Sequence, residues 1–198
     1  MLSKTAKRRR EEILRAAEDI ILTKGFGKAS MDVIAERAGC TRRTLYSYFS
    51  SKDVMFAELF ERHAVSQKYA KVQKSIEGLD FETALFQGFK LSIQLMRKDA
   101  LMHEFMYGGG AYWFQQQMMD DSSPIFQRTL LVNLSFWGGV IDDARLKGYI
   151  DTEVSNEQMM KWYGTVQYMM VVRVKTTQAE ADFLLKKFII PSLVNHAK

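Results

Sequence analysis

The side chains best suited to chemistry lie between residues 41 and 52, where arginines, hydroxyl groups and tyrosines follow one another closely. Arg42 and Arg43 can each donate two hydrogen bonds to the N7 and O6 acceptors of guanine, and either could read a base. Thr44 can contact a thymine methyl group or a base edge. Phosphate oxygens, which position a protein without carrying sequence information, suit three further residues: Tyr46, Tyr48 and Lys52. These residue types predict contacts with double-stranded DNA.

Two short helices are predicted to hold these side chains. Ser30 is the expected N-cap of the first helix, and Thr41 is the expected N-cap of the second. Gly39 allows a tight turn between them, while the small residues Ala35 and Ala38 let the two helix axes approach. This is the layout of a helix-turn-helix, in which the N-terminal end of the second helix enters the major groove. The outer side of that end carries Thr41, Arg42, Arg43, Thr44 and Ser47.

Positive charge is concentrated in the same part of the chain. Residues 1 to 52 hold twelve Lys or Arg against six Asp or Glu, a net of +6, whereas the remainder holds sixteen against seventeen, a net of −1. This asymmetry suggests a polyanionic partner, either nucleic acid or an anionic membrane face. The basic arm from Lys7 to Arg10 could follow the DNA backbone, reach the minor groove, or be a solvated tail. The predicted DNA-binding residues are Arg10, Ser30, Thr41, Arg42, Arg43, Thr44, Tyr46, Ser47, Tyr48 and Lys52.

The whole chain is predicted to be all-α. Apolar residues recur at spacings of three and four, strict alternation is absent, and only Pro124 and Pro191 interrupt the 198 residues. About nine helices are expected. Capping boxes are predicted where Ser155 precedes Gln158 and where Thr177 precedes Glu180. Beyond the helix-turn-helix, helices are expected over about 52–75 (capped by Ser50 or Ser51), 80–98, 100–107, 112–119, 124–147, 155–174 and 177–196.

Composition and charge predict two domains in a globular protein. Apolar residues make up 47% and charged residues 26% of the chain, and no apolar run is long enough to span a membrane. The only composition shift falls near residue 52. A DNA-binding domain is therefore expected over residues 1–52 and a larger helical domain over 53–198, joined by the helix at about 52–75. The single Cys40 and the lack of a signal-like N-terminus favour the cytoplasm.

Residues 13 to 56 resemble the N-terminal domain of the TetR family of bacterial transcriptional regulators. The resemblance rests on glycines, small residues and aromatics at the family's spacing: Ala16, Ala17, Gly25, Ser30, Ile34, Ala35, Gly39, the block TLYSYF from Thr44 to Phe49, and Lys52. One departure is Cys40, where the family more often has valine. By resemblance, the DNA-contacting positions are those of Thr44, Tyr46, Tyr48 and Lys52, and Arg42 and Arg43 stand at the variable reading positions.

The same resemblance implies properties of the whole molecule. These are an Ω-shaped homodimer, a small-molecule pocket in each C-terminal domain and, usually, repression that a ligand relieves. A dimer through the helices at about 155–174 and 177–196 also follows from the residues themselves, because their apolar side chains occupy more than one helical face. Gly164 would let a partner helix approach closely. The apolar residues concerned are Met159, Met160, Trp162, Tyr163, Val166, Met169, Met170, Val171 and Val172.

Methionines and aromatic residues between about 96 and 170 suit a pocket for an apolar or aromatic effector. Each of them, taken singly, is also typical of a protein core. The candidate effector-binding residues are Met102, Phe105, Met106, Tyr112, Trp113, Trp137, Trp162, Tyr163 and Met170.

Enzymatic, metal and cofactor sites are not predicted. His63, His103 and His196 are scattered, the run from Gly108 to Gly110 lacks the Lys and Ser or Thr of a phosphate-binding loop, and no nucleophile, base and orienting partner cluster together. The main hypothesis is a homodimeric repressor that binds a palindromic operator and releases it on binding a ligand. Two alternatives are an all-helical small-molecule-binding protein or enzyme that no longer reads DNA, and an architectural protein without operator specificity.

Overall fold

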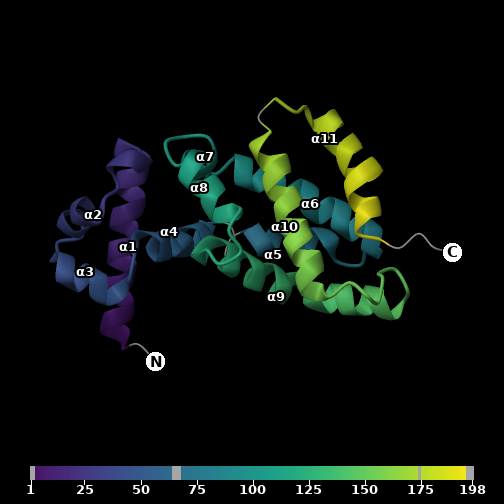
Figure 1. Ribbon diagram of the computed structural model, residues 1–198, viewed down its shortest axis with the longest axis horizontal. Coiled ribbons are helices and arrows are strands. Elements are labelled where there is room, and N and C mark those ends of the chain that lie inside the picture. The colour runs from purple at the N-terminus through teal and green to yellow at the C-terminus, as the bar shows by residue number, and fades with distance from the viewer. Residues whose placement is uncertain (1–2, 64–67, 174, 195–198) are drawn as a thin grey trace. The chain divides into compact units, whose positions relative to one another are not determined.

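The fold is all-helical, as the sequence predicts. The computed structural model describes residues 3–63, 68–173 and 175–194, and these form eleven α-helices and no strand (Figure 1). Their number exceeds the predicted nine partly because the helix expected over 52–75 is described as two, α4 and α5, with residues 64–67 outside the described part. The helices are α1 Lys4–Lys24, α2 Met31–Arg37, α3 Arg42–Tyr48, α4 Lys52–Glu61, α5 Lys68–Ile76, α6 Phe81–Arg97, α7 Ala100–Met106, α8 Ala111–Met118, α9 Pro124–Leu146, α10 Asn156–Val172 and α11 Gln178–Leu184.

The chain forms two compact units. The first contains residues 1–63 and 99–126, and therefore α1 to α4 together with α7 and α8. The second contains residues 64–98 and 127–198, with α5, α6, most of α9, α10 and α11. The units differ from the domains expected at residue 52, because α7 and α8 pack with the N-terminal helices. The functional division at residue 52 stays a prediction.

Aromatic side chains form the core of the first unit where α7 and α8 meet the N-terminal helices. Phe26, in a short turn after α1, lies 5.3 Å from Phe56 of α4 and 5.7 Å from Phe105 of α7, measured between ring centroids. Trp113 of α8 lies 5.2 Å from Phe26 and donates a 2.9 Å hydrogen bond from Nε1 to Asp53 of α4. The segment between residues 100 and 118 thus stabilises the start of α4.

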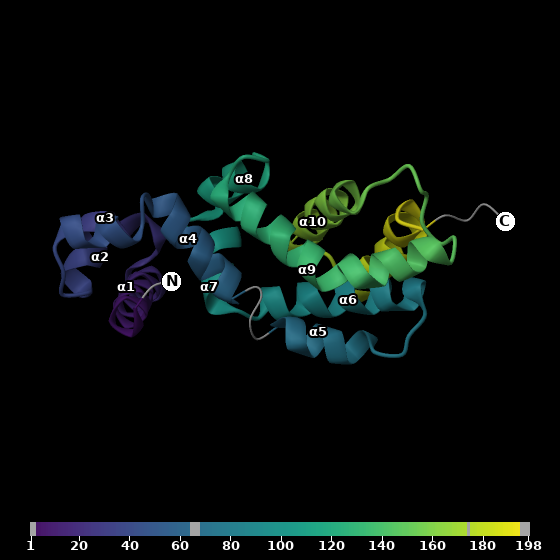
Figure 2. The same ribbon diagram turned by 90° about the horizontal axis from the view of Figure 1, so that it is seen from below.

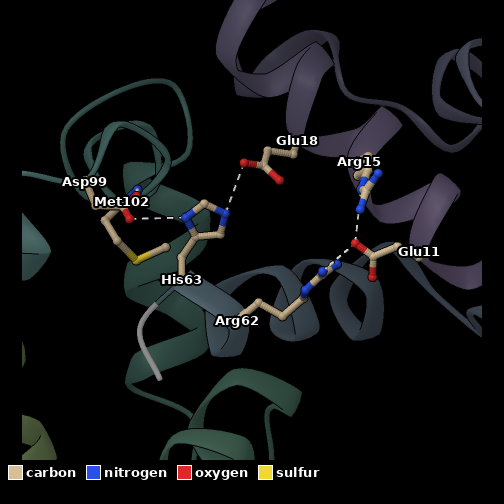
Figure 3. A network of polar contacts seen from close by, with 7 residues as sticks. All are labelled: Glu11, Arg15, Glu18, Arg62, His63, Asp99 and Met102. Atoms are coloured by element: carbon tan, nitrogen blue, oxygen red, sulfur yellow. Dashed lines mark hydrogen bonds and ion pairs between the residues drawn. The ribbon is translucent and has the colours of Figure 1, made fainter. Parts of the chain in front are cut away.

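A polar network joins three helices of the same unit (Figure 3). The His63 ring lies between two carboxylates: Nε2 is 3.1 Å from Glu18 of α1, and Nδ1 is 3.1 Å from Asp99, which precedes α7. Arg62 donates a 2.6 Å hydrogen bond to Glu11 of α1, and this interaction holds the pKa of that carboxyl below its ordinary value. The network connects α1, the C-terminal end of α4 and the N-terminal end of α7.

The second unit is built around Trp137 of α9, which is fully buried. Its ring lies 5.6 Å from that of Tyr163 in α10, and Tyr163 in turn lies 4.1 Å from Phe89 of α6. Figure 2 shows α5 and α6 side by side in this unit. Gly88 of α6 lets the indole approach, because a Cβ at that position would lie only 2.6 Å from Cη2 of Trp137. The core therefore depends on one glycine opposite one large ring.

A Gly88→Ala substitution is expected to destabilise the protein by about 2 kcal/mol, although alanine favours helices by about 1 kcal/mol. The added methyl group cannot fit without displacing the buried Trp137 ring. Urea unfolding followed by tryptophan fluorescence measures the change. Gly138→Ala in α9 is the matched control, because a Cβ there meets nothing within 4 Å and should leave stability equal or slightly higher. Equal stabilities of the two variants would contradict the packing argument.

The C-terminal helices differ in part from the prediction. The box of Ser155 and Gln158 is present at the start of α10, and Thr177 caps α11 by accepting a hydrogen bond from the Glu180 amide. The expected helix over 177–196 is α-helical only to Leu184, and it continues as a wider π-helical turn over Leu185–Ile189. The expected positions 174, 195 and 196 lie outside the described residues.

Candidate nucleic-acid interface

The helix-turn-helix forms through local hydrogen bonds. The Ser30 hydroxyl accepts from the amide of Val33 at 3.3 Å, and the Thr41 hydroxyl accepts from the amide of Thr44 at 3.1 Å, so both predicted N-caps are confirmed. Gly39, between the helices, has φ of +61°, a conformation that residues with a Cβ rarely adopt. Ser51, not Ser50, caps α4. The positions of α2 and α3 thus follow from residues adjacent in sequence.

One face of α3 is buried and the other is exposed. Leu45 and the following Phe49 are fully buried, which fixes how the helix lies on the rest of the first unit. Thr44 and Tyr48 are partly buried. The remaining predicted contacts on the helix are exposed: Thr41, Arg42, Arg43, Tyr46 and Ser47. The predicted reading residues therefore share one accessible face.

The two arginines of α3 have different surroundings. Arg42 forms an ion pair with Asp32 of α2 at 3.1 Å, and its guanidinium lies 5.5 Å from the centre of the Tyr46 ring. Arg43 is exposed and makes no hydrogen bond or ion pair with the residues that the structure describes. Arg42 thus already has interaction partners on the surface, whereas Arg43 is available without breaking an existing contact.

The hydroxyl groups of α3 are already partly used. Thr44 Oγ1 lies 2.9 Å from Thr41 Oγ1, and Ser47 donates to the Thr44 carbonyl at 2.6 Å. A hydroxyl that donates one hydrogen bond can still accept others. Ser47, and whichever of Thr41 and Thr44 donates to the other, are therefore better placed to accept hydrogen bonds from base amino groups, while the remaining threonine hydroxyl can still donate to a phosphate.

Lys52 lies at the start of α4 beside aromatic rings. Its Nζ is 4.7 Å from the centre of the Phe26 ring and 5.0 Å from that of Phe56, and partial burial lowers the pKa of the ammonium group. The ammonium is attracted to the ring faces while it keeps an exposed side. Lys52 remains a candidate for a phosphate contact.

Arg10 belongs to a helix and not to an extended arm, because Lys7 to Arg10 lie inside α1. Its guanidinium donates to both carboxylate oxygens of Glu58 in α4 and, at 2.6 Å, to the carbonyl of Tyr48 at the end of α3. It also lies 4.1 Å from the centre of the Phe49 ring. The sequence predicts a DNA contact for this residue, whereas the structure shows it bonded within the protein, next to the recognition helix.

The nine candidate effector-binding residues do not come together in one place. Met102, Phe105, Met106 and Trp113 belong to the first unit, where the first three are buried in its core, and Tyr112 is exposed. Trp137, Tyr163 and Met170 are buried in the second unit, while Trp162 is half-exposed and donates to Ser192. Proximity in sequence suggested one pocket. Residues 99–126 belong to the first unit, however, so candidates in this segment are separated from those after residue 127, which belong to the second unit.

An open groove of about 1200 Å³ lies between α5 and α9 in the second unit, and none of the nine candidates lines it. Its walls include Tyr69, Phe81, Phe136 and Tyr149. Tyr69 also contacts Asn133, a buried polar residue of α9 that the sequence did not single out. The available signal was an asparagine within the apolar face of the helix at 124–147.

Two further features bear on function. The described residues contain no group of three or more His, Cys, Asp or Glu arranged to hold a metal ion. Of the helices described, none is both long and apolar enough to cross a membrane.

Comparison with known proteins bears on the same N-terminal segment. Residues 13–59 match the family model described as "Bacterial regulatory proteins, tetR family". FasR from Mycolicibacterium smegmatis, named as an HTH-type transcriptional activator, is 40% identical over 55 residues, which cover 28% of this chain and 25% of that protein. This chain thus spans only about a quarter of the length of that curated relative.

Solved structures resemble the chain over nearly its full length. A TetR-family transcription regulator from Shewanella sp. PV-4 has a TM-score of 0.63 at 19% identity and covers 94% of this chain and 98% of its own. The transcriptional repressor QsdR of R. erythropolis also has a TM-score of 0.63, at 13% identity, covering 97% of this chain and 99% of its own. These likenesses concern the fold, while the motif match concerns the sequence. The N-terminal segment thus matches the TetR family of bacterial regulatory proteins in sequence, and the whole chain resembles solved TetR-family structures in fold.

Proposed function

We propose that this protein is a transcriptional regulator that binds a specific operator through α3. The observation that carries the proposal is the exposed face of α3, where Arg42 and Arg43 stand on a helix whose opposite side is buried through Leu45. Bidentate arginine contacts to guanine are the commonest specific contacts in the major groove. The net charge of +6 over residues 1 to 52, twelve basic against six acidic side chains, favours approach to DNA.

We propose further that the protein acts as a homodimer through α10 and the C-terminal helix. Large apolar side chains are exposed along both: Trp162 and Met169 are 46% and 50% exposed, and Phe183 and Phe188 are 55% and 63% exposed. Exposed apolar surface of this extent favours association with another chain. A two-fold dimer carries two copies of α3 and therefore binds a palindromic operator.

The proposed regulation is repression relieved by a small apolar or aromatic effector. Ligand binding can release the operator only if the ligand favours a state in which the two α3 helices no longer match the half-site spacing. The similar proteins include both activators and repressors of transcription, since FasR is named as an activator and QsdR as a repressor. A reporter gene placed behind the operator distinguishes repression from activation. Repression predicts lower expression of the reporter when the regulator is present without ligand.

A gel-shift titration with the DNA that flanks the protein's own gene tests the proposed function. At physiological salt, a specific regulator is expected to bind its operator at least about 10³-fold more tightly than random duplex. Excess random DNA should therefore leave the operator complex intact. Competition by random DNA at equal concentration would instead indicate an architectural protein, and failure to bind either DNA would contradict the proposal.

A further inference from the structure

Three buried side-chain atoms of α9 make no hydrogen bond with the residues described: Thr129 Oγ1, Asn133 Nδ2 and Trp137 Nε1. Among the residues described, Thr129 Oγ1 and Asn133 Nδ2 are shielded from solvent and make no hydrogen bond, and Asn133 as a whole is only 1% exposed. The two residues are four apart in the helix and therefore lie on one face, one turn from each other. Buried polar groups in folded proteins are almost always hydrogen-bonded, so two such atoms side by side suggest a place for a bound molecule.

The free group of Asn133 is a donor. Tyr69 of α5 donates its hydroxyl proton to Asn133 Oδ1, and burial raises the pKa of Tyr69, so the hydroxyl keeps that proton. The amide oxygen is therefore occupied and the amide N–H₂ is not. Asn133 Nδ2 faces Gly164 of α10, where a Cβ would lie 3.7 Å from it. Gly164 thus leaves room beside the amide, while the close helix approach between subunits that the sequence suggested stays a prediction.

Thr129 adds a second hydrogen-bonding group. A threonine within a helix commonly donates its hydroxyl to the carbonyl four residues earlier, but Thr129 does not do so among the described residues. Its hydroxyl is free to donate. The ring of Trp137, one turn beyond Asn133 on the same face, provides a flat wall, and its buried indole N–H is a further donor without a partner among the described residues.

Tyr69 separates these buried groups from the open groove between α5 and α9. Its ring lines the groove and packs 4.6 Å from that of Phe136, which also lines it, while its hydroxyl contacts Asn133. Charged side chains on the groove wall include Lys74 and Asp143, near the ends of α5 and α9, and Lys147, which follows α9. A rotation of the Tyr69 side chain would join the groove to the space beside Asn133.

We infer that the effector is an elongated apolar or aromatic molecule with one uncharged hydrogen-bond acceptor, such as a ketone, ester, lactone or amide carbonyl. The apolar part lies in the α5–α9 groove, and the carbonyl accepts hydrogen bonds from Asn133 Nδ2 and Thr129 Oγ1. An ionised carboxylate is disfavoured, because burying a charge needs a compensating charge, and the described partners of Asn133 are neutral. This inference rests on the proposed function for its regulatory meaning, but not for the binding itself.

Three probes of similar size test the inference: 4-phenyl-2-butanone with a neutral acceptor, butylbenzene with none, and 3-phenylpropanoate with a charge. Binding to the full protein without DNA is measured by ligand-observed NMR or calorimetry. The ketone is expected to bind about 5- to 30-fold more tightly than butylbenzene, because it satisfies buried donors that are otherwise unpaired. The carboxylate is expected to bind no better than butylbenzene.

An Asn133→Leu variant is expected to reduce the ketone's advantage to about 1-fold, with little change in butylbenzene affinity. Thr129→Val, which keeps the side-chain shape, should also reduce the ratio of ketone affinity to butylbenzene affinity. This variant replaces Asn133→Leu in the test if Asn133→Leu does not fold. Leu131→Ala is the matched control, because Leu131 is 64% exposed on the same helix and does not line the groove. No preference for the ketone in the wild type, including no binding of any probe, overturns the inference, as does an unchanged ratio in both variants.

The same preparations are then assayed for operator binding by gel shift. A specific operator complex together with no preference for the ketone would contradict the inferred ligand class but support the proposed function as a transcriptional regulator. A ketone preference lost in Asn133→Leu, together with no discrimination between operator and random DNA, would support the site and contradict the proposed function.

Discussion

An Arg42→Ala, Arg43→Ala double variant is expected to bind the operator about 10²- to 10³-fold more weakly than the wild type, because each good bidentate contact to guanine contributes about 1–3 kcal/mol. Its thermal stability should change little, since the ion pair of Arg42 with Asp32 is 63% exposed on both sides and pairs of this kind contribute little. Gel-shift titrations at fixed salt measure the affinity.

The control variant removes the same two charges elsewhere. Arg15→Ala with Arg173→Ala lowers the net charge equally, the two side chains are 75% and 56% exposed, and neither residue belongs to α3. Its affinity for operator and random DNA should fall only slightly. Equal losses in the two double variants would show that α3 contributes charge and not sequence recognition. The single variants separate the arginines: Arg43→Ala should have the larger effect if the side chain without an internal partner reads the base.

An Arg10→Met substitution is expected to destabilise the protein by about 2 kcal/mol and to lower the melting temperature by roughly 4–8 °C. Arg10 and Glu58 are 23% and 18% exposed, so their pairing is better shielded than a surface ion pair. The substitution also removes the hydrogen bond to the Tyr48 carbonyl, which fixes the end of α3. Operator affinity should therefore fall about 10-fold through loss of preorganisation. Thermal unfolding and gel shifts on the same samples measure both effects.

Arg8→Met is the matched control for Arg10. It lies in the same helix, its side chain is 77% exposed, and its ion pair with Glu12 spans one helical turn on the surface. Its replacement should change stability by less than about 0.5 kcal/mol. If Arg10→Met weakened operator binding without lowering stability, a direct DNA contact of Arg10 would be favoured over the positioning role that its hydrogen bonds indicate.

The helix-turn-helix could be predicted from the sequence because the interactions that form it are local. Ser30 and Thr41 cap helices that begin at the next residue, and Gly39 supplies the turn between them. Periodicity likewise identified α6 and α9 nearly to the residue, because each buries a stripe of apolar side chains. Signals of this kind span a few residues and do not depend on the rest of the chain.

Tertiary structure alone decided which of these residues share an environment. Arg10 is bonded to Glu58, 48 positions later, Trp113 to Asp53, 60 positions earlier, and Tyr69 to Asn133, 64 positions later. Such partners are set by how helices pack, and an arginine or tryptophan has the same sequence signature whether it contacts DNA, a ligand or a neighbouring helix. The sequence by itself therefore determined the resemblance of the N-terminal segment to the TetR family and the face of α3 proposed to read DNA. Only the packing bonded Arg10 to Glu58 and left the amide N–H₂ of Asn133 buried without a partner among the described residues, since such contacts depend on segments that the local pattern does not contain.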